Sequence, residues 1–229
     1  MLVARWVELV LLYAVTPVTL AWAAERFAYR RAMAPLLWVA SAIALVVLLR
    51  DSSFDRGLLL RLPLGDPHVR VIALRFVLLA APLLALGRWL VPGEFLRFLR
   101  RRPGLWLAFA ALYPALSVIP QGILFRVYFV QRFGVLLGSR PLLLVAGALA
   151  FSLGHVIFRN VPALVITAVG GALFLDTYLR TGSMLLAAAE HGAYGIIAFT
   201  AGLGTFLYLG ARPRAPPKPP NCEERSRSQ

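Results

Sequence analysis

The chain has 229 residues, of which 60% are hydrophobic and only 15% are charged, and its mean hydropathy is +0.76. Because charged residues make up about a quarter of a soluble domain, this composition excludes the soluble globular class. The formal net charge is +14, but the basic residues stand singly or in small groups between apolar stretches, which indicates membrane loops and argues against a nucleic-acid-binding protein.

Apolar stretches long enough to span a bilayer, which takes about 20 residues, follow one another along the chain. The first three spans are predicted at about 6–24, 34–49 and 71–86. Arg75 stands one turn inside the third span, close enough for its side chain to snorkel to the membrane surface. Segment 88–103 mixes arginine with tryptophan, phenylalanine and leucine, and this composition predicts an interfacial helix on an anionic leaflet.

A fourth span is predicted to begin near residue 105 and to continue through Arg126 to about residue 133. Pro114 and Pro120 lie inside it, so we expect a kink. Three further spans are expected at 141–158, at 161–179 and at 183–209, and Gly202 and Gly204 could break the last of them.

The expected fold is therefore all-α, a polytopic bundle of about seven transmembrane helices with one interfacial helix. We divide the chain into N-terminal membrane helices with the interfacial helix (1–103), core helices (104–210) and a Pro-rich tail (211–229) that should be disordered. The single cysteine, Cys222, lies in that tail, which excludes an intramolecular disulfide and a cysteine-based zinc cluster.

Lysine and arginine are more numerous in the first, third and fifth loops and in the tail than on the other side. The positive-inside rule then places the N-terminus outside and the tail in the cytoplasm. We expect a multi-pass protein of a prokaryotic inner (cell) membrane, in contact with membrane lipids.

Five ionisable residues stand within or beside the later spans, all in the C-terminal half of the chain. Charged and titratable groups at membrane depth are costly, so each is a candidate for a functional role. Such a histidine can also serve structure alone, by bonding a carbonyl or hydroxyl group of a neighbouring helix. For two histidines accompanied by a glutamate and an arginine, a site is the favoured reading. The five are Arg126, His155, Asp176, Glu190 and His191.

The two histidines stand in surroundings that allow close helix packing. Phe151 and His155 are four residues apart and share one helix face, and small residues adjoin both His155 and His191. Two neutral imidazoles on facing helices can hold a water molecule or a divalent metal such as zinc. Water activated in this way suits amide hydrolysis.

Three short segments resemble, in order and spacing, the CPBP intramembrane proteases, which include the CAAX prenyl endopeptidases and the abortive-infection-like membrane proteins. They are residues 120–129 (PQGILFRVYF), 151–160 (FSLGHVIFRN) and 190–195 (EHGAYG). The resemblance covers about half of the chain, from residue 105 to residue 209; the earlier helices match only in being hydrophobic.

In that family a pair of glutamates is followed after three residues by arginine, a phenylalanine after three residues by histidine, and a last histidine after three residues by asparagine or aspartate. Arg126 matches the arginine, Phe151 and His155 match the second motif, and His191 matches the last histidine. The resemblance implies a cavity open to the membrane in which water is activated against a peptide bond of a membrane-anchored protein or peptide. It leaves open whether a metal held by His155 and His191 takes part.

The sequence departs from the family where carboxylates are expected. The glutamate pair falls on Gln121 and Gly122, and the last asparagine or aspartate falls on Gly195. Glutamine can position water but cannot take up a proton at neutral pH. Glu190 is the only carboxylate next to a matched histidine, yet adjacent helix residues point about 100° apart, so Glu190 and His191 cannot both face one pocket.

The candidate catalytic residues are His155, His191, Gln121, Gly122, Arg126 and Glu190. Two further polar residues have simpler explanations. Asn160 is a possible site residue, but a helix cap is favoured because Pro162 follows in the first turn. Asp176 could pair with Arg126 or, four residues on, with Arg180.

Three functions compete. The first is an intramembrane endopeptidase that cleaves prenylated or otherwise membrane-anchored C-terminal segments. The second is a pseudoprotease of the same fold that binds or scaffolds membrane proteins. The third, a small transporter, is disfavoured because no inverted repeat or pair of broken helices is evident.

Overall fold

The computed structural model describes residues 2–26 and 32–207, and every regular element within these ranges is helical. The N-terminal elements are α1 (Leu2–Val10), η1 (Leu11–Val15), α2 (Thr16–Arg26), α3 (Met33–Arg50), α4 (Gly57–Leu60), α5 (Pro67–Leu90) and α6 (Arg97–Arg101). The later elements are α7 (Pro103–Tyr113), η3 (Pro114–Val118), α8 (Ile119–Gly122), η4 (Ile123–Tyr128), α9 (Phe129–Leu137), α10 (Arg140–Leu153), η5 (Val156–Phe158), α11 (Val161–Thr181), α12 (Met184–Thr200) and η6 (Leu203–Thr205). The predicted disordered tail and Cys222 lie outside the described residues.

Within the described part, six helical segments are long and apolar enough to cross a membrane, and α12 is a shorter apolar helix of 17 residues. The all-α architecture of membrane-spanning helices is thereby confirmed, and the chain is a multi-pass integral membrane protein. The six segments are Leu2–Ala24, Met33–Arg50, Pro67–Leu90, Pro103–Leu137, Arg140–Phe158 and Val161–Thr181.

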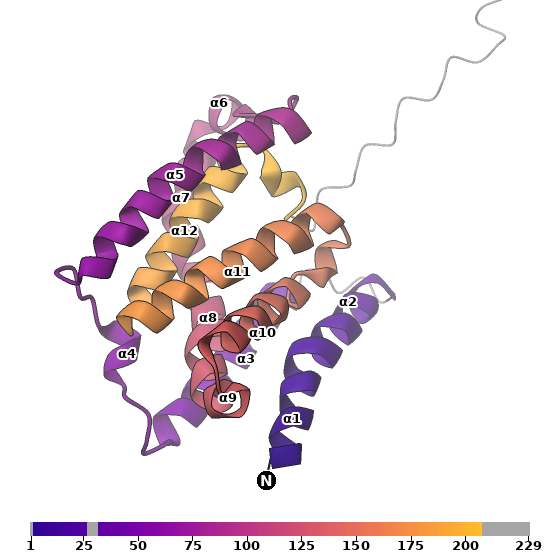
Figure 1. Ribbon diagram of the computed structural model, residues 1–229. Helices are drawn as coiled ribbons and strands as arrows, with labels where there is room; N and C mark the ends of the chain where they lie inside the picture. Colours follow the sequence, from indigo (N-terminus) through magenta and orange to yellow (C-terminus); the bar gives the residue numbers. More distant parts are fainter. Residues whose placement is uncertain (1, 27–31, 208–229) are drawn as a thin grey trace, which may run out of the picture.

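The bundle combines contacts between consecutive helices with contacts between helices that are far apart in the chain. Helix α10 packs on α11, α11 on α12, and α12 on α5, so that α5, although early in the sequence, lies beside the last helix (Figure 1). The segment made of α1, η1 and α2 packs against α9, α10 and η5. The arrangement leaves α5 as an additional wall beside the C-terminal helices.

The helix predicted over 88–103 is not continuous. Helix α5 runs on to Leu90, a turn follows, and only Arg97–Arg101 is helical. The cause is Pro92, because a proline disfavours the helical conformation of the residue before it and offers no N–H to the helix. Val91 accordingly leaves the helical region, with φ −137° and ψ 59°.

The predicted fourth span is a single helical segment from Pro103 to Leu137. It widens into π-helical turns at Pro114–Val118 and at Ile123–Tyr128. Proline lacks the N–H of a regular α-helical turn, and such wide turns are common where side chains must be re-aimed at a site. The predicted break after α12 is also confirmed, because Gly202 adopts φ +88°, and a Cβ there would stand 2.8 Å from the backbone of Glu94.

Asn160 caps α11, as predicted. Its Oδ1 accepts a hydrogen bond of 2.8 Å from the Ala163 N–H, and its Nδ2 donates to the carbonyls of Phe158 and Phe206. Replacing Asn160 by alanine should lower the free energy of unfolding by about 1 kcal/mol, since the first turn of α11 loses its cap. Thermal unfolding in detergent measures this. Asn160→Ser, which restores an acceptor, should recover part of the loss; an unchanged Tm for Asn160→Ala would contradict the prediction.

Candidate active site

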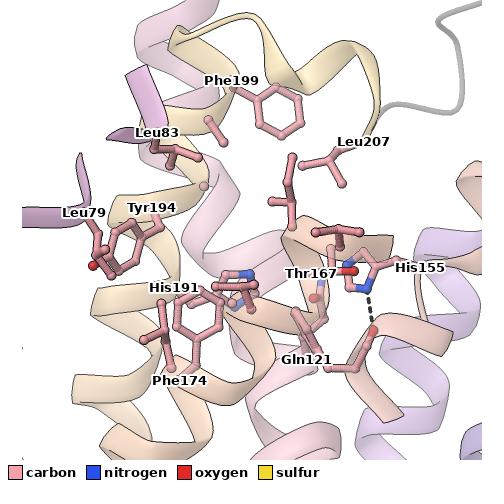
Figure 2. Close-up of a pocket in the computed structure, with 18 of the residues that line it drawn as sticks. Leu79, Leu83, Gln121, His155, Thr167, Phe174, His191, Tyr194, Phe199 and Leu207 are labelled. Atoms are coloured by element: carbon pink, nitrogen blue, oxygen red, sulfur yellow. Dashed lines mark hydrogen bonds between the residues drawn. The ribbon is translucent and has the colours of Figure 1, made fainter. Parts of the chain in front are cut away.

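A cavity of about 580 Å³ opens between α5, the long segment 103–137, the end of α10, α11 and α12 (Figure 2). Most of its wall is apolar, which suits a cavity at membrane depth. Seven polar side chains interrupt that wall: Tyr113, Ser117, Gln121, His155, Thr167, His191 and Tyr194. The apolar wall includes Leu79, Leu83, Phe151, Phe158, Phe174 and Phe199.

Tyr113, Ser117 and Gln121 reach the cavity from one helical segment because they follow each other at intervals of four residues. Gln121 Nε2 donates a hydrogen bond of 2.8 Å to Ser117 Oγ. The amide oxygen of Gln121 is buried and has no hydrogen-bond partner among the described residues. This free acceptor can orient a water molecule or a substrate N–H.

His155 stands where α10 ends, between Leu153 and the short helix η5. Its Nδ1 lies 2.7 Å from the Phe151 carbonyl oxygen, the contact drawn as a dashed line in Figure 2. A carbonyl can only accept, so this contact places the imidazole proton on Nδ1 and leaves the Nε2 lone pair of the neutral ring available. The geometry thus fixes the tautomer that a general base requires.

His191 comes from α12 and is buried. Its ring stacks on Phe174 with centroids 4.6 Å apart, and its Nε2 lies 3.3 Å from the Tyr113 hydroxyl. Its Nδ1 has no hydrogen-bond partner among the described residues. The Phe151 ring contacts both imidazoles, at centroid distances of 4.6 Å to His155 and 5.5 Å to His191, so the two histidines belong to one cluster.

Arg126 is fully buried beneath this cluster and does not line the cavity. Its guanidinium carbon lies 4.6 Å from the ring centre of Phe151 and 5.2 Å from that of Phe174. Both terminal nitrogens lack a hydrogen-bond partner in the described part of the chain. Arg126 therefore contacts the rings that hold His155 and His191, and stabilises its charge through cation–π contacts and not through a carboxylate.

The two glycines at the family's carboxylate and amide positions have different surroundings. A Cβ on Gly122 would point at Met184 Sδ, 3.2 Å away, and not into the cavity. A Cβ on Gly195 would collide with the Tyr113 ring at 2.4 Å. Tyr113 thus occupies the place that a side chain at position 195 would need, and its hydroxyl is the group beside His191 Nε2.

Glu190 faces away from the cavity, as the 100° offset from His191 requires. Its Oε1 lies 2.7 Å from Arg75 Nη2, and its Oε2 accepts a hydrogen bond of 2.5 Å from Thr177 Oγ1. Arg75 also binds Asp176 at 3.0 Å. The expectation that Arg75 snorkels was wrong, because two carboxylates within the bundle hold it.

Asp176 does not pair with Arg126. Its two oxygens contact Arg75 Nη1, Arg140 Nη2 and Arg180 Nε, at 3.0, 2.6 and 2.8 Å. The predicted pair with Arg180 is confirmed. Asp176 and Glu190 thereby belong to one ionic network that joins α5 and the start of α10 to α11 and α12.

The cavity offers an incomplete donor set for a catalytic zinc ion, which usually has three protein ligands. No group of three or more His, Cys, Asp or Glu side chains with suitable geometry occurs among the described residues. His155 and His191 supply two imidazoles, and no carboxylate lines the cavity in the described part. The residues present do not fit that metal, and we derive no step through one.

Comparison with known protein families identifies the C-terminal helices. Residues 102–197 match the family described as type II CAAX prenyl endopeptidase Rce1-like. This segment is an Rce1-like domain of the CPBP family. It contains all six candidate catalytic residues together with Tyr113, whereas α5, which supplies part of the cavity wall, precedes it. No curated protein and no solved structure matches the chain.

Four polar cavity residues of the Rce1-like domain were not identified from the sequence: Tyr113, Ser117, Thr167 and Tyr194. Tyr113 and Ser117 precede Gln121 by eight and four residues. The helical period from Gln121 backwards would have placed both on its face. The sequence interpretation placed the Arg75 side chain at the membrane surface. Arg75 lies within an otherwise uncharged apolar run, and this position indicates that its charge needs a partner inside the bundle.

Proposed function

We propose that the protein is an intramembrane endopeptidase of CPBP type that hydrolyses a peptide bond in the C-terminal segment of a membrane-anchored protein. The observation that carries the proposal is the His155 imidazole, whose Nδ1–H is fixed by the Phe151 carbonyl and whose Nε2 is left free at a cavity shared with His191 and Gln121. We place the protein in a prokaryotic inner membrane with its tail in the cytoplasm.

In the proposed reaction a water molecule lies between His155 Nε2 and the free amide oxygen of Gln121. His155 Nε2 takes one proton from the water as its oxygen attacks the carbonyl carbon of the scissile peptide. The imidazolium then returns that proton to the leaving nitrogen as the C–N bond breaks, so the products are a carboxylic acid and an amine. The Tyr113 hydroxyl and His191 stand beside this site as hydrogen-bonding groups for the carbonyl oxygen.

The cavity wall supports a membrane-anchored substrate. Leu79, Leu83, Phe158 and Phe199 line it with apolar surface, which accommodates a lipid-modified or hydrophobic segment, and the polar side chains of the same cavity offer hydrogen-bond partners to the peptide groups. The same wall limits bulk water, so that the few polar groups act in a medium of low dielectric constant.

Replacing His155 by alanine tests the proposal. Cleavage of a prenylated reporter peptide by the full chain in membranes should fall by about 10²- to 10⁴-fold, because the general base is lost. His68→Ala is the matched control, since His68 is the third histidine of the chain and pairs with Asp66 at the start of α5, away from the cavity. Equal rates for the natural chain and His155→Ala would contradict the assignment.

A pseudoprotease that binds membrane-anchored proteins is the second candidate. It is favoured by one observation, that no carboxylate lines the cavity in the described part of the chain and Gln121 stands in place of glutamate. A binding protein would retain the reporter peptide in the membrane-bound complex without cleaving it. Retention that is equal for the natural chain and His155→Ala, with no cleavage by either, would favour this alternative.

A further inference from the structure

A second, polar pocket of about 300 Å³ shares no lining residue with the candidate active site and lies where the first, second and fourth membrane segments have their ends. It opens beside the start of α1, the end of α3 and the start of α9, at the end of the bundle that carries the N-terminus (Figure 1). Its lining residues are Arg5, Val47, Leu48, Arg50, Asp51, Tyr128, Gln131 and Arg132.

The carboxylates near this pocket are already engaged. Glu8 is held by Arg132, with Nη2 and Oε2 2.7 Å apart, and by the Tyr128 hydroxyl. Asp51 Oδ1 accepts hydrogen bonds from the N–H and hydroxyl of Ser53. Asp51 Oδ2 accepts one from Gln131. These hydrogen bonds lower the pKa of Asp51, so it stays ionised and satisfied without an arginine partner.

The guanidinium groups of Arg5 and Arg50 are not paired with these carboxylates. Arg5 donates a single hydrogen bond, to the Arg132 carbonyl at 3.3 Å. Neither Arg5 nor Arg50 forms an ion pair with a carboxylate of the described residues. Each guanidinium carries five N–H donors, so Arg5 and Arg50 can donate several further hydrogen bonds to a bound acceptor. The three arginines of the lining exceed the neighbouring carboxylates, Asp51 and Glu8, by one positive charge, so the fitting acceptor is an anion.

An apolar stripe leads from this pocket along the outside of α3. Val47 lines the pocket, and Ile43 and Val39 precede it at intervals of four residues on the same helix face. They expose 44%, 60% and 56% of their surface. A cationic pocket at the membrane boundary that continues into an exposed apolar stripe matches a molecule with a charged head and a hydrocarbon chain.

From this combination we infer that the pocket binds an anionic phospholipid, whose phosphate is held by Arg5 and Arg50 and whose acyl chain lies along Val47, Ile43 and Val39. Guanidinium groups bind phosphate oxygens through paired, charge-assisted hydrogen bonds. The site belongs to the helices that precede the Rce1-like domain, joined by Arg132 of that domain, and it is independent of the proposed hydrolysis.

Native mass spectrometry of the delipidated full chain, titrated with phosphatidylglycerol, tests the inference. Arg5→Gln and Arg50→Gln should each weaken binding by about fivefold, since one arginine at a membrane surface contributes about that much. Arg70→Gln is the control, because Arg70 is an exposed arginine in the first turn of α5 that does not line the pocket. It should change binding by less than about twofold. Thermal unfolding without lipid verifies that all variants are folded.

Two further titrations test whether the pocket recognises the lipid as a whole, its charge alone or a free phosphate ion. Phosphatidylcholine, which carries the same chains on a zwitterionic head, should bind several-fold more weakly than phosphatidylglycerol. Inorganic phosphate at the same concentration should not displace the lipid. Displacement by inorganic phosphate, equal binding of the two lipids, or equal losses for Arg50→Gln and Arg70→Gln would each overturn the inference.

Discussion

Replacing Gln121 by glutamate is expected to accelerate peptide hydrolysis by about tenfold, less than the 10²- to 10⁴-fold that a first general base supplies, because His155 already takes the proton from water. Position 121 lines the cavity with His155 and His191, and the amide oxygen there is buried without a partner among the described residues. A carboxylate at this place could take the proton from water that glutamine cannot accept. Initial rates on a prenylated reporter peptide in membranes measure the effect.

Gly122→Glu is the matched control, because it adds the same carboxylate one residue along the chain. A side chain at 122 points at Met184 and not into the cavity. It should therefore leave the rate nearly unchanged. The double variant Gln121→Glu/His155→Ala should lose part of the gain. Acceleration by Gly122→Glu but not by Gln121→Glu would show that position 122, and not position 121, faces the cavity.

Removing the charge of Arg75 should destabilise the fold by about 3–5 kcal/mol, the cost of breaking a buried ion pair by deleting one partner. Glu190 has only 1% of its side chain exposed and takes its charge balance from Arg75. In Arg75→Met the carboxylate would keep only the hydrogen bond from Thr177. Thermal unfolding of the purified protein in detergent measures the loss.

Arg180→Met serves as the control for Arg75. Arg180 also binds Asp176, but 41% of its side chain is exposed, and Asp176 retains Arg75 and Arg140. Its loss should lower the free energy of unfolding by less than about 1 kcal/mol. In the double variant Arg75→Met/Glu190→Gln no charge is left without a partner, so much of the stability should return. Equal losses for Arg75→Met and Arg180→Met would argue against a buried pair.

Much of the fold was predictable because the hydrocarbon core of a membrane places the same requirement on every segment that spans it. A spanning segment must be helical and apolar over about 20 residues, so runs such as 141–158 and 161–179 can be recognised from composition alone. Helix ends were also predictable where their chemistry is local. Asn160 caps α11 and Gly202 follows α12 in a left-handed conformation, and both roles depend on residues within a few positions.

The organisation of the site was less predictable, because it depends on contacts between distant helices. The spacing of Gln121 and Gly122 does not reveal which of the two faces the cavity; that follows from the π-helical turns before and after them and from Met184 on α12. The partner of Arg75 is a glutamate 115 residues later in the chain. A pattern within one helix contains no information about such a pair.

Helix α5 forms part of the cavity wall, although it lies outside the Rce1-like domain. Leu79 and Leu83 form part of the wall, Arg75 holds the helix to Glu190, and Gly87 lies so close to α12 that a Cβ there would stand 2.3 Å from the Ala201 carbonyl. Residues 102–197 are thus the part that matches the family, but α5, which precedes that part, completes the wall of the cavity. A chimaera that grafted only 102–197 onto other membrane helices would carry the histidines and lose the wall that encloses them.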